Sequence, residues 1–212
     1  MLKHILCYGD SNTWGYIPEG TGRYAVDVRW TGVMAAALGS DYRVIEAGLN
    51  GRTTVFNDPM RDDANGKAYL PTTLRTHMPL DLVILMLGTN DLKSRFSASV
   101  ADIALGMGNL IEIVLNSRSG QAEKAPACLI VCPPPIAENF DSSEWAGQGI
   151  GALEKSKQLA PNYAKIAASL GVAFFDASTV IESSPVDSVH LSADAHATLG
   201  QALAQVVSGL PL

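Results

Sequence analysis

A serine near the start of the sequence, and an aspartate and a histidine near its end, are the residues best suited to catalysis. Ser11 lies in the segment Gly-Asp-Ser-Asn-Thr (residues 9–13), and Asp187 and His190 stand three positions apart before a helical pattern. A serine hydroxyl is a weak nucleophile, so it needs an imidazole to accept its proton and a carboxylate to fix the imidazole tautomer. The sequence therefore predicts Ser11 as nucleophile, His190 as base and Asp187 as the residue that orients the base.

Attack on a carbonyl carbon also needs hydrogen-bond donors for the developing oxyanion. Candidate donors follow the first three apolar runs: the backbone N–H groups of Ser11 and Gly48 and the side-chain amide of Asn90. If the first three strands lie in the order 2-1-3, neighbouring strand ends are about 5 Å apart. The three donors are then expected to converge on one point.

The elements that must position these residues alternate between short apolar runs and longer helical patterns. Such runs, apolar on both faces, predict parallel strands covered by helices on both sides. An alternation of this kind indicates an α/β protein with an open, doubly wound sheet, whose ligands bind outside the carboxyl ends of the strands. The predicted strands are 4–8, 42–47, 81–87, 127–132 and 172–176.

Helices are predicted between these runs. The segment from Val100 to Leu115 has apolar residues at i, i+3, i+4 and i+7, and Ser99 with Asp102 forms a possible capping box before it. The last helix begins after Ser192 as N-cap and stops before Gly209. The other predicted helices are 29–39, 66–77 and 153–170, and the last is 193–208.

Composition limits the class of protein. The chain has 212 residues with 47% hydrophobic residues, so it can bury a full core, and we expect a single domain over residues 1–212. No apolar run approaches the roughly 18 residues of a membrane span. The net charge of −6, without a clustered basic stripe, argues against nucleic acid as a partner. We therefore expect neither a membrane nor a nucleic-acid partner.

The three cysteines and the N-terminal segment bear on the compartment. Cys7, Cys128 and Cys132 each lie in an apolar run, and their odd number predicts reduced thiols. Cys128 and Cys132 are four residues apart on one strand and are expected in the core. The first apolar run meets Gly9 at once, which leaves no room for a signal peptide. The expected location is the cytoplasm.

The motifs together resemble the SGNH (GDSL-type) hydrolases over nearly the whole chain. The first block has Asn12 where the motif that names the family has Leu, at a position away from the catalytic atoms. Four further matches resemble the bacterial arylesterase and acyltransferase branch: residues 9–15, Arg29-Trp30, residues 50–54 and residues 88–91. The four family blocks are Gly9-Asp10-Ser11, Gly48, Gly88-Thr89-Asn90-Asp91 and Asp187-x-x-His190.

This resemblance implies a three-layer α/β/α, flavodoxin-like fold with a five-stranded parallel sheet in the order 2-1-3-4-5. It also implies a serine esterase that hydrolyses short-chain acyl esters, such as acetyl and aryl esters, through an acyl-Ser11 intermediate, with acyl transfer to alcohols as a further activity. No cofactor and no metal are expected. Asp10, Asn12 and Trp14 are candidate substrate-binding residues.

Three alternatives stay open. A carbohydrate O-deacetylase would use the same mechanism. A non-catalytic flavodoxin-like module that binds flavin or nucleotide would place a phosphate near residues 11–13, although no glycine-rich phosphate motif occurs. A metallophosphoesterase would use Asp10 and Asn90-Asp91 as ligands, but the chain has only 4 histidines to fill two metal sites.

Several residues also have ordinary structural interpretations. Trp14 either lines the acyl pocket or packs in the core, and Arg52 is expected to be solvated or paired in a salt bridge rather than in contact with substrate. His4 is expected at the start of a strand. His77 and His196 are expected on helix surfaces.

The segment 133–151, after the fourth predicted strand, is longer than an ordinary unstructured loop. Its aromatic residues are spaced too irregularly for one helix face. Because it leaves the carboxyl edge of the sheet, we expect it near Ser11 as a lid or a subunit contact. The prediction is a homo-oligomer with a narrow entrance that prefers acetyl and other short acyl esters.

Overall fold

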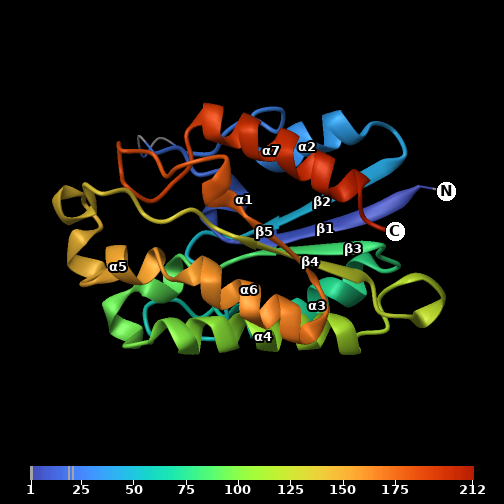
Figure 1. The fold of residues 1–212 in the computed structure, drawn as a ribbon, viewed down its shortest axis with the longest axis horizontal. Helices are drawn as coiled ribbons and strands as arrows, with labels where there is room; N and C mark the ends of the chain where they lie inside the picture. Colours follow the sequence, from blue (N-terminus) through green and yellow to red (C-terminus); the bar gives the residue numbers. More distant parts are fainter. Residues whose placement is uncertain (1, 19, 21) are drawn as a thin grey trace.

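A computed structural model describes residues 2–18, 20 and 22–212 and shows a parallel sheet with helices on both faces (Figure 1). The strand order is β2-β1-β3-β4-β5, and all neighbours are parallel. Both the three-layer fold and the order 2-1-3-4-5 are confirmed. The strands are β1 (Lys3–Gly9), β2 (Tyr42–Gly48), β3 (Leu82–Met86), β4 (Ala127–Cys132) and β5 (Ala173–Asp176).

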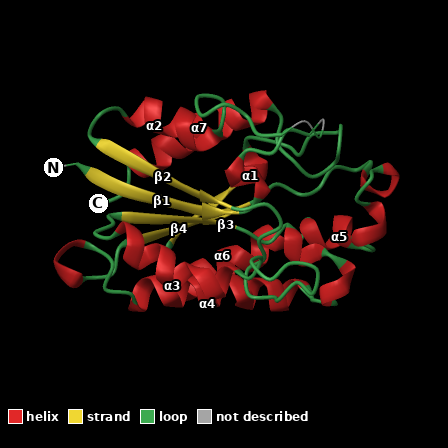
Figure 2. Cartoon of the chain, turned by 180° about the vertical axis from the view of Figure 1, so that it is seen from behind, coloured by secondary structure: helices red, strands yellow, loops and turns green. Residues whose placement is uncertain are grey.

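The helices form two layers (Figures 1 and 2). One face of the sheet is covered by α2 (Trp30–Leu38) and α7 (Ala193–Ser208), and the other by α3 (Gly66–His77), α4 (Val100–Asn116) and α6 (Leu159–Leu170). Shorter helices occur mainly in the loops. These are α1 (Ser11–Trp14), α5 (Ala152–Ser156) and the 3-10 turns η1 (Asn90–Leu92), η2 (Ser94–Phe96), η3 (Gln121–Glu123), η4 (Phe140–Ser142), η5 (Ala146–Gln148) and η6 (Ala177–Thr179).

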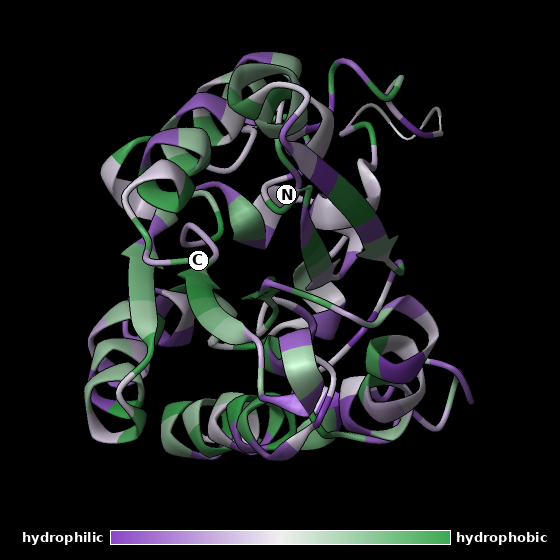
Figure 3. Ribbon diagram, turned by 90° about the vertical axis from the view of Figure 1, so that its right-hand side faces the viewer, coloured by the Kyte–Doolittle hydropathy of each residue, from purple (hydrophilic) through white to green (hydrophobic). Residues whose placement is uncertain are grey.

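Each face of the sheet has its own hydrophobic core. Along β1, Leu6 and Tyr8 pack with residues of α3, α4 and α6, whereas Ile5 and Cys7 pack with residues of α2 and α7. This alternation follows from the two-residue period of a strand. In Figure 3 several strands are coloured hydrophobic and the helices around them mix both colours, as expected for a sheet that is buried on both faces. Cys7, Cys128 and Cys132 are buried free thiols, as predicted.

Local sequence signals fix most helix ends. At the start of α4, Ser99 Oγ accepts the Asp102 N–H at 3.1 Å and the Asp102 carboxylate accepts the Ser99 N–H at 2.9 Å. This is the predicted capping box, which satisfies two otherwise unpaired backbone donors. Ser192 caps α7 by accepting the N–H of Ala195. Both predicted caps are confirmed.

The predicted helix 153–170 is wrong in one respect, because it consists of two helices, α5 and α6, separated at residues 157–158. Pro161 stands in the first turn of α6. Proline has no N–H and its ring clashes with the preceding turn, so it favours the first turn of a helix over the interior. Here one helix ends before the proline and another begins, whereas α3 continues through Pro71.

His196 was predicted on a helix surface, but it is fully buried between α7 and α2. Its Nδ1 accepts the N–H of Trp30 at 3.2 Å. Position 196 belongs to the stripe that continues through Leu199, Leu203 and Val207, all of which are buried. The spacing of three and four residues places this histidine on the apolar face of the helix.

The carboxyl ends of the strands carry α1 and the loops around α5, at the end of the molecule opposite both chain termini (Figure 1). Within the described residues, no helix combines the length and the apolar character needed to cross a bilayer. The edge with α1 and α5 is where the predicted catalytic residues meet.

Candidate active site

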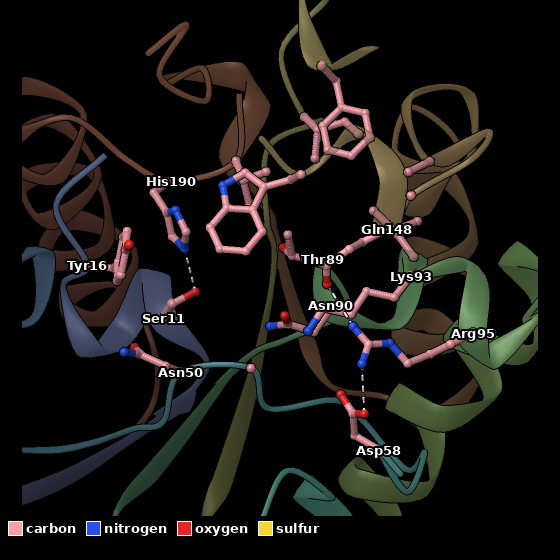
Figure 4. A pocket seen from close by; sticks show the side chains of 18 of the residues that line it. Ser11, Tyr16, Asn50, Asp58, Thr89, Asn90, Lys93, Arg95, Gln148 and His190 are labelled. Atoms are coloured by element: carbon pink, nitrogen blue, oxygen red, sulfur yellow. Dashed lines mark hydrogen bonds and ion pairs between the residues drawn. The ribbon is translucent and has the colours of Figure 1, made fainter. Parts of the chain in front are cut away.

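Ser11 and His190 face each other at this edge of the sheet (Figure 4), and Asp187 lies behind the histidine. Ser11 is the first residue of α1, directly after β1, and its Oγ lies 2.9 Å from Nε2 of His190. Nδ1 of the same ring lies 2.5 Å from a carboxylate oxygen of Asp187. In the neutral tautomer that fits these contacts, Nδ1–H donates to Asp187 and Nε2 is free to accept the serine proton. The three residues thus have the hydrogen-bond order of a nucleophile, its base and the residue that orients the base.

The turn from Asp187 to His190 fixes the carboxylate. One Asp187 oxygen accepts the N–H groups of Val189 at 3.0 Å and His190 at 2.9 Å, and the other faces the imidazole. Ser188, which follows Asp187 in this turn, has a φ of 70°, a left-handed conformation that few non-glycine residues adopt. Burial raises the pKa of Asp187, but the hydrogen bond and charge of His190 and the two N–H groups outweigh burial, so the pKa is lowered. The carboxylate stays ionised beside the histidine.

Two aromatic rings hold the imidazole of His190 from its sides. The ring of Tyr16 lies 4.2 Å from it, centroid to centroid, and the ring of Trp145 lies 6.2 Å away in an edge-on orientation. Neither residue was predicted in this role. Tyr16 follows the first motif closely, and that proximity was the signal available in the sequence.

Asn12, predicted to bind substrate, instead forms hydrogen bonds to the histidine loop, the segment 187–191 that contains His190. Its Oδ1 accepts the N–H of Leu191 at 3.1 Å, and its Nδ2 donates to the carbonyl of Val189 at 3.4 Å. These two residues flank His190. Asn12 is 2% exposed and does not line the cavity. Its position indicates that it fixes α1 and the histidine loop relative to each other.

Gly48, a predicted oxyanion donor, has a different environment from the one expected. It ends β2 and does not line the cavity, and a Cβ at this position would lie 2.2 Å from the backbone nitrogen of Trp14. The glycine therefore allows α1 to pack against the end of β2. Gly51, which the sequence interpretation missed, does line the cavity.

Gly51 occupies a tight turn closed by the hydrogen bond from Arg52 N–H to the carbonyl of Leu49 at 3.1 Å. Its φ is 80°, the left-handed value that the third position of a type II turn requires and glycine adopts most easily. Among the described residues, its own N–H has no hydrogen-bond partner. This N–H is available to a ligand in the cavity.

The amide of Asn90 lines the cavity opposite Ser11. Its Nδ2 donates to the carbonyl of Arg52 at 3.2 Å and is only loosely held, at 3.5 Å, by the carboxylate of Asp10. An oxyanion can therefore take over the second hydrogen of this amide at little cost. Asp10, predicted to bind substrate, does not line the cavity but caps α1 by accepting the Asn12 N–H.

Burial raises the pKa of Asp10 to about 6, although the Asn12 N–H and the charges of His190 and Arg52 oppose the shift. The carboxyl group of Asp91, in the next block, is also buried, and its pKa is likewise raised to about 6. Asp91 accepts hydrogen bonds from the N–H of Thr54, at 2.9 and 3.1 Å, and from its hydroxyl. The pair ties the segment 50–54 to the segment 88–91.

Arg52 is neither solvated nor paired in a salt bridge, so that prediction is wrong. Its guanidinium is buried, donates to the carbonyls of Gly9 and Ala47, and lies 4.0 Å from the ring centroid of Tyr8. The Gly9 carbonyl also accepts the N–H of Leu49 at 3.1 Å, so it has a partner besides Arg52. Arg52 thus joins the carboxyl ends of β1 and β2 next to the Gly51 turn.

The sequence leaves two roles open for Trp14, which either lines the acyl pocket or packs in the core. It does not line the cavity, and its ring lies under the guanidinium of Arg23 at 5.1 Å. This arrangement supports the packing role.

The cavity has a volume of about 330 Å³, with Ser11 and His190 on one side. The segment 133–151 lies over it, as predicted, and contributes Ile136, Phe140, Trp145, Gln148 and Gly149 to the lining. This segment is tied to the histidine loop, because the Ala137 N–H donates to the Ser188 carbonyl at 2.8 Å and the Ser188 hydroxyl donates to Asn139 at 3.0 Å. Hydrogen bonds therefore connect the segment 133–151, called the lid below, to the loop that carries Asp187 and His190.

The chain is similar to known proteins over nearly its whole length. The sequence model of the GDSL-like lipase/acylhydrolase family matches residues 7–198. The chain is a member of this family. The match includes Ser11, Asn90, Asp187 and His190, and it agrees with the resemblance identified from the motifs.

Solved structures of the family resemble the chain over almost its whole length. A carbohydrate acetylesterase from Sinorhizobium meliloti is 45% identical with a TM-score of 0.92, covering 97% of this chain and 98% of the other. The inhibitor-bound aryl esterase of M. smegmatis is 45% identical with a TM-score of 0.91, covering 98% and 99%. A search of curated proteins finds no significant match. The family and these relatives make the chain a serine ester hydrolase, and they do not support a non-catalytic flavin or nucleotide module.

Proposed function

We propose that this hydrolase cleaves short-chain acyl esters, such as acetyl and aryl esters, through an acyl-Ser11 intermediate. Ser11 Oγ attacks the ester carbonyl carbon while its proton moves to Nε2 of His190. The tetrahedral intermediate then expels the alcohol, which takes that proton from His190. Water attacks the acyl-serine by the same route, releasing the acid and restoring the Ser11 hydroxyl. Asp187 keeps the imidazole in the tautomer that each step needs.

The proposed oxyanion donors are the N–H groups of Ser11 and Gly51 and the side-chain amide of Asn90. Ser11 and Asn90 were predicted from the sequence, and Gly51 replaces Gly48. The unpaired N–H in the Gly51 turn and the weakly held second hydrogen of the Asn90 amide support this choice. Donors fixed in advance around the oxyanion need no reorganisation when the charge develops.

The observation that carries the proposal is the contact of 2.9 Å between Ser11 Oγ and His190 Nε2 at the wall of the cavity. The preference for short acyl groups is supported by the lid, since Phe140 and Trp145 narrow the cavity beside the triad. An apolar cavity of this kind also lets an alcohol compete with water for the acyl-serine. Acyl transfer is therefore part of the proposal.

A carbohydrate acetylesterase activity is the second candidate. Its support is the similarity to the carbohydrate acetylesterase from Sinorhizobium meliloti. The mechanism and residues would be the same, and only the alcohol would differ.

The central test uses a serine-directed organophosphorus reagent and a panel of p-nitrophenyl esters of increasing acyl length, beside acetylated saccharides. We expect one label per chain, on Ser11, and the highest kcat/KM with acetate. Ser11→Ala should abolish labelling and turnover, whereas Ser169→Ala, on an exposed part of α6, should change neither. A label on another residue, or full activity of Ser11→Ala, would contradict the mechanism.

Two further parts of the proposal are a homo-oligomer and a cytoplasmic location. Met60, which lines the cavity, and Ile150, next to the lining residue Gly149, are 74% and 77% exposed, and a second subunit that covered them would remove this apolar surface from water. The three free thiols are compatible with a reducing compartment. Sedimentation of a 22.4 kDa species at micromolar concentration would contradict the oligomer.

A further inference from the structure

The side of the cavity opposite the triad carries three cationic side chains. Arg61, Lys93 and Arg95 all line the cavity. In Figure 4, Lys93 and Arg95 lie beyond Asn90, on the side away from Ser11 and His190. The chain as a whole has a net charge of −6, so this local gathering of positive charge opposes its overall balance.

Arg95 already has its partners. Its Nη1 donates to the carboxylate of Asp58 at 3.2 Å, and its Nη2 donates to the side-chain carbonyl of Gln148, in the lid, at 2.7 Å. Asp58 is 4% exposed and also accepts the N–H of Met60 at 3.0 Å. The buried carboxylate of Asp58 is thus paired with Arg95 and with a backbone N–H group.

Arg61 is also satisfied. Its guanidinium is paired with Asp63 at 3.1 Å and donates to the backbone carbonyl of Asn50. Arg61 and Arg95 are thus each compensated by one carboxylate, Asp63 and Asp58.

Lys93 differs from both arginines. Within residues 2–18, 20 and 22–212, its ammonium group forms no hydrogen bond or ion pair, although the side chain is half-buried in the cavity wall. Burial and the nearby charges of Arg95 and Arg61 lower its pKa, against the opposing effect of Asp58 and Asp10. A cation that is partly removed from water beside like charges is stabilised by an anion.

We propose that Lys93 binds a carboxylate group of the ester substrate, on the cavity wall that also carries Arg61 and Arg95. The inference rests on the proposed esterase function and specifies its substrate class: esters that carry a carboxylate. Lys93 follows the turn Asn90–Leu92, and Asn90 is the proposed oxyanion donor. The carboxylate should therefore lie a few atoms from the reacting carbonyl, on either the acyl or the alcohol part of the ester.

Two matched pairs of esters test this inference on the full chain. For the acyl part, mono-p-nitrophenyl succinate is compared with p-nitrophenyl butyrate, which has the same chain length without the charge. For the alcohol part, 4-acetoxybenzoate is compared with its methyl ester. In the wild type, we expect at least one charged ester to exceed its neutral match in kcat/KM by roughly 10- to 100-fold, the usual value of a charge-assisted hydrogen bond.

Lys93→Met keeps most of the apolar stem and removes the charge, so the ratio of charged to neutral ester should fall toward one. Lys93→Arg should keep most of the ratio. Lys165→Met, on the exposed side of α6, changes the net charge equally but should leave the ratio unchanged. Added salt should lower kcat/KM of the charged ester relative to the neutral one in the wild type, a measurement that needs no variant.

The inference is overturned if neither charged ester is preferred by the wild type, or if the preference persists in Lys93→Met. Hydrolysis of p-nitrophenyl acetate separates this result from the proposed function. A wild type that cleaves the acetate but shows no preference for charge contradicts only the carboxylate site. A wild type that cleaves no ester contradicts the esterase proposal itself.

Discussion

Replacement of Asn12 by alanine tests whether this residue positions His190 or binds substrate. Asn12→Ala removes the acceptor of the Leu191 N–H and the donor to the Val189 carbonyl. Leu191 is fully buried, so its N–H would lose its partner without gaining water. Leaving such a donor unsatisfied costs about 1–3 kcal/mol. The bond to Val189 is long, at 3.4 Å, and should add little.

Thermal unfolding should register this cost. For a chain of this size, 1 kcal/mol corresponds to about 2–4 °C, so we expect Tm to fall by roughly 2–12 °C. The histidine loop can relieve the unpaired N–H only by moving, and that motion displaces His190 from Ser11. A displacement of about 1 Å is enough to reduce the rate about 100-fold. We expect kcat to fall by about 10- to 100-fold.

Kinetics on p-nitrophenyl acetate decides between the two roles. A positioning residue lowers kcat with little change in KM, because Asn12 does not line the cavity. Asn116→Ala, at an exposed position of α4, removes an asparagine of similar size and should change neither parameter. A raised KM with unchanged kcat would refute the positioning argument and restore the predicted substrate-binding role of Asn12.

Further predictions concern the triad, the oxyanion hole and stability in acid. Asp187→Asn should lower kcat by up to about 10⁴-fold, because an amide does not enforce the required tautomer of His190; activity near wild type would exclude this role. Asn90→Ala should lower kcat by about 10²- to 10³-fold at unchanged Tm, and an unchanged kcat would remove Asn90 from the oxyanion hole. Burial lowers the pKa of His196 to about 4 from an ordinary 6.5. Between these two pH values the imidazole is protonated in the unfolded chain but neutral in the folded one. The free energy of unfolding should therefore fall by about 3 kcal/mol as the pH drops from above 6.5 to about 4. His196→Asn keeps an acceptor for Trp30 N–H and should remove this loss, which denaturant titrations at several pH values measure; parallel pH curves for both proteins would contradict it.

The sequence by itself predicted the fold and the three residues of the proposed triad, which the structure brings into contact. Periodicity of two or of three and four residues is a local property, so it is readable without knowing what each element touches. Parallel strands must also present their carboxyl ends at one edge, which brought Ser11 and Asn90 together in the prediction. The helix pair α5 and α6 shows the limit of periodicity, because the predicted helix 153–170 is interrupted at residues 157–158.

Only the tertiary structure decided which groups support the site. Asn12 and Leu191 are 179 residues apart in the sequence, and their hydrogen bond depends on how α1 and the histidine loop are oriented. Gly48 and Gly51 are both glycines near one strand end, and nothing local says which N–H faces the cavity. Arg52 has no special sequence environment, but strand-end carbonyls surround it in the fold.

The same reason applies to Lys93, whose type and spacing resemble those of any surface lysine. Among the described residues its ammonium group has no partner, because the nearby carboxylate of Asp58 is paired with Arg95, and that pair joins two separate loops at the cavity. Hydrogen-bond partners and burial are set by long-range contacts, whereas secondary structure and residue chemistry are set locally. The residues of the proposed triad were therefore predictable from the sequence, and the long-range contacts around them were not.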